Sequence, residues 1–92
     1  MFNKLKHLKD LKNQAKTLEN ALAEESVTVE RGGIILVMDG NQKIKSLTIN
    51  SELDAGTIQE LIPPLVNEAN EKIKKIMAQT FQSMGGLNLP GM

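Results

Sequence analysis

The sequence predicts an α+β fold in which a helix, a three-stranded antiparallel meander and a longer helix follow one another. Residues 27–50 form the only stretch rich in β-branched residues and hairpin turns, and the flanking stretches carry apolar residues at helical spacing. A chain of 92 residues is the length of one domain. We expect its parts to be a helical arm at 1–25, a β-meander at 26–50, a C-terminal helix at 57–84 and a tail at 85–92.

The first helix is predicted from Phe2 to Glu25 by an apolar stripe that repeats at 3.6 residues per turn. The stripe consists of Leu8, Leu11, Ala15, Leu18 and Leu22. A period near 3.5 would also take in Leu5 and Phe2, so pairing of a coiled-coil kind is an open alternative to packing on the body.

Positive charge gathers at the start of the chain, although the net charge is zero. Residues 1–18 hold five lysines and one acid, and residues 19–30 hold four acids and no base. The face of the first helix opposite the apolar stripe carries Lys6, Lys9, Lys12 and Lys16. Such a row is either a solvated helix face or a rod that lays positive charge along phosphates, a role that suits lysine as a point charge.

The meander turns at Arg31-Gly32-Gly33 and at Asp39-Gly40-Asn41, where we expect Gly and Asn to supply positive φ angles. Its middle strand, Ile34–Met38, is apolar without alternation, which indicates that both faces are dry. The helices of a chain this small can cover only one face of the sheet. We therefore expect a second copy of the chain to cover the other face. The alternative is a strand with two partly exposed aliphatic side chains. The predicted dimer interface is Ile34, Leu36, Met38, Leu47 and Ile49.

The C-terminal helix is predicted in two pieces. Thr57 and Glu60 form a capping box that opens a short helix, Ile58–Ile62. Pro63-Pro64 should then kink or restart it, because proline lacks a donor and disfavours a helical residue before it. The long piece should run to about Ser83.

Several classes of function are excluded by composition. The chain has no Cys and one His, which rules out thiolate sites, a catalytic Cys-His or Ser-His-Asp set and a His-pair metal site. It has no phosphate-binding glycine loop and no membrane-spanning run. Its only arginine, Arg31, lies in a turn, which argues against base-specific readout. We therefore expect no enzyme activity, no cofactor and no metal, and a cytoplasmic protein.

The order of these parts resembles the YbaB/EbfC family of bacterial nucleoid-associated proteins over nearly the whole chain. The segments on which this resemblance rests are Met1-Phe2-Asn3-Lys4, Gly32-Gly33 before an apolar strand, Asp39-Gly40-Asn41, Ile49-Asn50-Ser51-Glu52-Leu53, Leu65-Val66-Asn67-Glu68-Ala69 and the Gly-Leu-Asn-Leu-Pro-Gly tail. The resemblance implies a tweezer-like homodimer in the nucleoid that binds double-stranded DNA with little sequence preference. The DNA-binding residues that it implies are Lys4, Lys6, Lys9, Lys12 and Lys16, joined by Lys72, Lys74 and Lys75.

A second hypothesis is a protein-interaction scaffold without a direct role on DNA. In that case the leucine stripe of the first helix, or the apolar tail at 87–92, recruits a protein partner. The acidic stretch at 19–30 and the neutral total charge favour this alternative.

Overall fold

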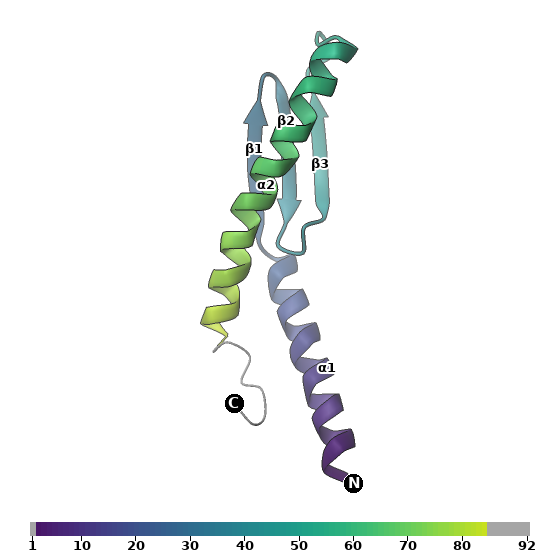
Figure 1. Cartoon of the computed structure of the whole chain (residues 1–92), viewed down its shortest axis with the longest axis vertical. Coiled ribbons are helices and arrows are strands. Elements are labelled where there is room, and N and C mark those ends of the chain that lie inside the picture. The colour runs from purple at the N-terminus through teal and green to yellow at the C-terminus, as the bar shows by residue number, and fades with distance from the viewer. Residues whose placement is uncertain (1, 85–92) are drawn as a thin grey trace.

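The computed structural model describes residues 2–84, with side chains from Leu8 onwards. Its elements are α1 (Phe2–Ala23), β1 (Ser26–Arg31), β2 (Ile34–Asp39), β3 (Ile44–Ile49) and α2 (Ala55–Ser83) (Figure 1). The predicted α+β order is confirmed. The tail at 85–92 and the side chains of Lys4 and Lys6, to which the sequence assigned roles, lie outside the described part.

The three strands form one antiparallel sheet in the order β1-β2-β3. Gly32 and Gly33 make the first turn with φ angles of 59° and 97°, as their residue type predicts. Leu36 of β2 lies opposite Val29 of β1 and Leu47 of β3. Residues paired in this way point to the same face of a sheet, so these three share one face.

Helix α2 crosses that face over β1 and β2 and makes the core with them (Figure 1). The fully buried side chains are Val29, Ile34, Leu36, Met38, Leu65, Ala69 and Ile73. Burial alternates along β2, because Ile35 is 36% exposed and Val37 is half-buried on the other face. Within one subunit, the expectation of two dry faces for this strand is therefore not met.

The predicted interruption at Pro63-Pro64 is wrong, because α2 runs unbroken through both prolines. The prolines leave the carbonyls of Gln59 and Glu60 without their usual amide donors. Both residues are exposed, so water can donate hydrogen bonds to those carbonyl oxygens. Leu65 directly after them is fully buried against the sheet, and that packing holds the helix together against its local preference.

Helix α2 also begins earlier than the sequence predicts, at Ala55, and its cap is Asp54 in place of Thr57. The backbone N–H of Thr57 donates to Asp54 Oδ1 at 2.7 Å. This hydrogen bond to the charged form lowers the pKa of Asp54 below its usual value.

We expect Asp54→Ala to lower the midpoint of thermal unfolding at neutral pH, since the cap accepts a donor that α2 cannot satisfy itself. A lowered folded-state pKa means that the ionised carboxylate stabilises the fold above the usual pKa of Asp. That stabilisation is lost as the pH falls through the lowered value. The gap between wild type and variant should therefore shrink towards acid pH in unfolding curves. Glu52→Ala, which removes an exposed carboxylate just before the cap, is the control. If Glu52→Ala lowered the unfolding midpoint as much as Asp54→Ala does, the assignment of Asp54 as the cap of α2 would be wrong.

We call the sheet and α2 together the body. The body and α1 make an elongated molecule with extents of 62 × 20 × 18 Å. Within residues 2–84, neither helix carries an apolar stretch long enough to cross a bilayer.

Candidate nucleic-acid interface

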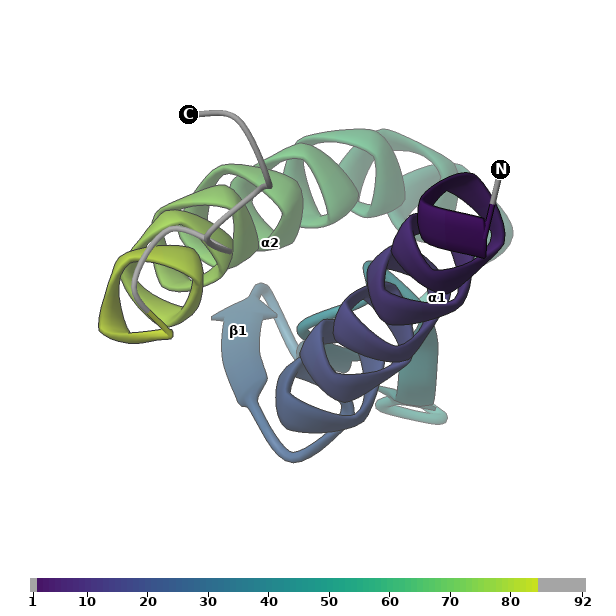
Figure 2. The ribbon, with the colours of Figure 1, turned by 90° about the horizontal axis from the view of Figure 1, so that it is seen from below.

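Helix α1 projects from one end of the sheet as an arm (Figure 1). Its 22 residues span about 33 Å at the rise of an α-helix. All side chains from Leu8 to Asn13 are exposed, so this stretch of the arm does not pack on the sheet or on α2. Viewed from below, in Figure 2, α1 and the far end of α2 diverge, and the arm stands apart.

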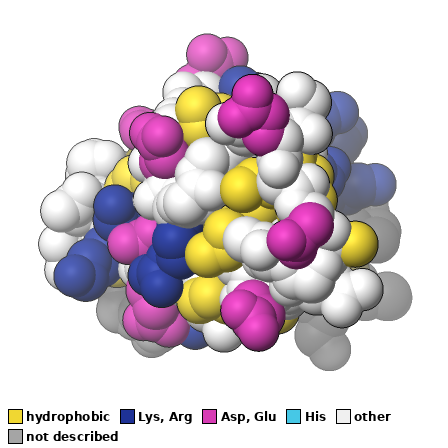
Figure 3. Space-filling model, turned by 90° about the horizontal axis from the view of Figure 1, so that it is seen from above, with side chains coloured by type: hydrophobic (Ala, Val, Ile, Leu, Met, Phe, Trp, Pro, Cys, Tyr) yellow, Lys and Arg dark blue, Asp and Glu magenta, His cyan; other side chains and the backbone are white. Residues whose placement is uncertain are grey.

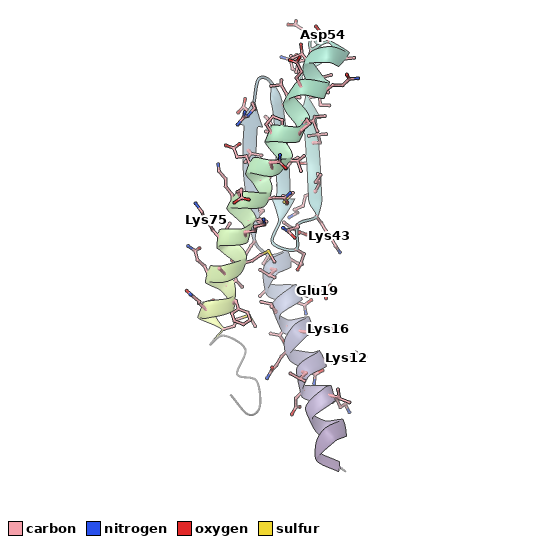
Figure 4. The ribbon with its side chains drawn as sticks, viewed as in Figure 1. Lys12, Lys16, Glu19, Lys43, Asp54 and Lys75 are labelled. Carbon is pink, nitrogen blue, oxygen red and sulfur yellow. The ribbon has the colours of Figure 1, made fainter. Side chains whose placement is uncertain are left out.

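Among the arm residues whose side chains are described, Lys9, Lys12 and Lys16 are exposed. Their spacing of three and four residues places them on one side of the helix, and Figure 4 labels the last two along its length. Lys9 and Lys16 lie about 10 Å apart along the axis, roughly three phosphate steps of one DNA strand. Among the described residues, the one ion pair joins Lys74 to Glu71 at 3.5 Å, so these arm lysines are unpaired.

The α2 lysines of the prediction, Lys72, Lys74 and Lys75, are also exposed but do not join the arm lysines in one patch. Lys74 is partly neutralised by its ion pair with Glu71. Lys75 follows the buried Ile73 by two positions and so faces away from the sheet. In Figure 4 it lies well apart from the arm lysines.

Two further lysines, which the sequence reasoning missed, lie near the foot of the arm. Lys43 is in the β2–β3 turn and Lys45 is in β3, and both are exposed. Figure 4 places Lys43 beside the end of α1. It lines an open hollow of about 370 Å³ together with Leu18, Leu22 and other residues of α1. No helical period marks a lysine in a turn, so only the tertiary contact reveals its position.

The foot of the arm is joined to the β2–β3 turn by backbone contacts. The N–H of Gly40 donates to the carbonyl of Leu22 at 2.9 Å and to that of Glu25 at 3.1 Å. The side-chain Nδ2 of Asn41 donates to the carbonyl of Glu19 at 3.0 Å. The Leu22 side chain is only 5% exposed. We call this set of contacts the arm joint.

Asp39 organises the turn side of the arm joint. Its side chain is buried, and Oδ1 accepts from the N–H groups of Asn41 at 2.8 Å and Lys43 at 3.0 Å. The positive φ angle expected at Gly40 or Asn41 is found at Gln42, at 65°. Gly40 serves another purpose, because a Cβ atom there would overlap the carbonyl oxygen of Leu22.

The residues predicted at a dimer interface fall into two groups. Ile34, Leu36 and Met38 are buried beneath α2 in the single subunit, so their surface is already occupied. Leu47 and Ile49 are 42% and 38% exposed. They lie on the helix-bearing face of the sheet, on the strand that α2 does not cover.

Other large apolar side chains are exposed on β3 and on the arm. Ile44 on β3 is 52% exposed, and Leu8 and Leu11 on the arm are 64% and 37% exposed. We call these three residues with Leu47 and Ile49 the apolar strip. Ile44, Leu47 and Ile49 lie on one face of β3, and large apolar side chains that are exposed in such a group indicate a contact surface.

Exposed acidic side chains lie both at the end of the body where α2 begins and at the foot of the arm. Acidic side chains surround the end of the body where α2 begins (Figure 3). Glu52, Asp54 and Glu60 are exposed at that end, whereas the arm carries exposed lysines together with Asp10 and Glu19. Within the described residues, no cluster of three or more His, Asp and Glu side chains could hold a metal ion.

The fold and the site define a small α+β protein with a projecting basic helix. A family model described as the YbaB/EbfC DNA-binding family matches residues 1–87, and the chain belongs to this family. Curated relatives named nucleoid-associated protein include one from Syntrophobacter fumaroxidans, 29% identical over 99% of this chain and 89% of the relative. Another, from Ruminiclostridium cellulolyticum, is 37% identical over 91% of this chain and 76% of the relative. A third, from Caldicellulosiruptor bescii, is 34% identical over 75% of this chain and 65% of the relative.

Proposed function

We propose that this protein is a nucleoid-associated DNA-binding protein that contacts the duplex through the lysines of α1, with little preference for sequence. The observation that carries the proposal is the row of unpaired lysines on an arm that stands clear of the body. Family membership and the names of the relatives support the same class.

The lysine side chain explains why sequence preference should be low. An ammonium group contacts phosphate as a point charge and does not match the edge of one base pair. The acidic end around Glu52 and Glu60 repels phosphate, so it should orient the subunit with its arm towards the duplex.

We further propose a homodimer in which the apolar strip of each subunit is covered by the other. A two-fold dimer uses the same patch on both copies, and the strip gives each copy an apolar surface to offer. Pairing would bring two arms to one duplex in the manner of tweezers. Of the interface residues predicted from the sequence, Leu47 and Ile49 take part directly, while the buried Ile34, Leu36 and Met38 support them from within the core.

The scaffold alternative is favoured by one observation, the exposure of Leu8 and Leu11 on the arm. In that case a protein partner would cover the apolar strip, and DNA binding would be weak. Purified protein that stays monomeric and leaves plasmid DNA unretarded at low salt would favour this alternative.

The test is binding of the purified protein to random-sequence duplexes over a range of salt, with its mass measured by light scattering. Lys9, Lys12 and Lys16 in each of two subunits should contribute about −5 to the slope of log K against log salt. Duplexes of different sequence should bind with similar affinity. No retardation of plasmid DNA by micromolar protein at low salt would contradict the proposal.

A further inference from the structure

The arm joint is the main attachment that fixes where the arm lysines point. The stretch of the arm from Leu8 to Asn13 is exposed. Packing of α1 on the rest of the chain is concentrated at its end, where Leu22 is buried. The direction of the arm therefore depends on contacts near its end, which are the arm joint and the contact of α1 with α2.

We propose that Gly40 and Asn41 are positioning residues for DNA binding, which set the angle at which α1 leaves the body. This inference rests on the proposed function. Gly40 brings its N–H to the carbonyls of Leu22 and Glu25, at 2.9 and 3.1 Å, and the absence of a Cβ atom permits that approach. Asn41 adds a side-chain hydrogen bond to the carbonyl of Glu19, one turn further along the arm.

Two attachment points on successive turns fix a direction, whereas one alone would leave a pivot. The carbonyls of Leu22 and Glu19 are three residues apart, and both accept hydrogen bonds from the β2–β3 turn. Asp39 stabilises that turn, because its Oδ1 accepts hydrogen bonds from the N–H groups of Asn41 and Lys43. The turn therefore binds the end of α1 as well as connecting β2 to β3.

A small error at the arm joint has a large effect at the lysines. A rotation of about 10° moves the tip of a helix about 33 Å long by about 6 Å. Phosphates on one strand are about 3.4 Å apart along the axis, so this rotation shifts the arm by more than one phosphate. Positioning by the joint should thus affect how many lysines reach phosphate at once.

The test measures the direction of the arm separately from DNA binding. The chain has no cysteine, so Asn13→Cys on the arm and Asn67→Cys on α2, beyond the prolines, give two unique spin-label sites, both exposed. Pulsed electron spin resonance, with labelled protein diluted into unlabelled, should give a narrow distance distribution. Asn41→Ala should broaden it, and Gly40→Ala should shift it further.

The same variants, without labels, should bind duplex DNA about tenfold more weakly at 0.1 M salt, which corresponds to the loss of about one phosphate contact. Far-ultraviolet circular dichroism of Asn41→Ala should remain that of the wild type. The matched control is Gln42→Gly, which removes the neighbouring exposed amide where the positive φ of 65° suits glycine. It should leave both the distances and the affinity unchanged.

The outcomes separate the two claims. An unchanged distance distribution in Asn41→Ala and Gly40→Ala would overturn the positioning role, whether or not the protein binds DNA. A broadened distribution with unchanged DNA affinity would also overturn it. Failure of the wild type to bind DNA would overturn the proposed function, while the distances would still report whether the joint sets the arm.

Discussion

Replacing Lys9, Lys12 and Lys16 together with glutamine should weaken binding to duplex DNA by at least about 100-fold at 0.1 M salt. Each phosphate contact accounts for about 0.9 log units of affinity at that concentration, so the loss of six contacts in a dimer sets an upper limit of about five log units. The slope of log K against log salt should fall towards zero as well. Titrations at several salt concentrations, on duplexes of two unrelated sequences, measure both quantities.

The matched control for this variant is Lys72, Lys74 and Lys75 replaced together with glutamine, which changes the net charge by the same amount. These lysines lie on α2, apart from the arm, and one is already paired with Glu71. We expect a loss of affinity several-fold smaller than that of the arm variant. An equal or larger loss would show that α2 carries the DNA contacts.

Replacing Leu47 and Ile49 together with aspartate should convert the dimer to monomers. The substitution puts two charges into an apolar contact, where they would have to be buried without partners. The monomers should bind DNA far more weakly, because each presents one arm in place of two. Light scattering and DNA titration on the same sample check both effects.

Thr48→Asp is the control that distinguishes the two faces of the sheet. Thr48 lies between the two substituted residues and opposite Ile35, on the face that α2 does not cover. The proposed interface predicts that this variant stays a dimer. If Thr48→Asp dissociates the dimer and the double variant does not, then the subunits pair through the open face around Ile35 and Val37.

The sequence was a good guide to elements whose causes are local. Gly32 and Gly33 mark the first turn because its positive φ angles are costly for other residues. Apolar residues at helical spacing likewise placed both helices. The same local rules misled at Pro63-Pro64, where burial of Leu65 outweighs the preference of proline.

Features that depend on which parts of the chain meet could not be predicted in this way. An apolar run such as Ile34–Met38 does not reveal which face its own helix will cover. The arm joint is made largely by backbone groups, and a glycine such as Gly40 equally fits the geometry of a hairpin turn. Lys43 reaches the site only because the turn docks on α1.

The paired prolines divide the hydrogen-bond ladder of α2 into two parts. Ahead of them, the turns that begin at Ala55 lack two of the amide links that would tie them to the rest of the helix. Helix fraying from that end should therefore stop at the prolines and not propagate to the core around Ile73. The first part of α2 can open and close as a small unit of its own, while the sheet and the arm seated on it stay folded.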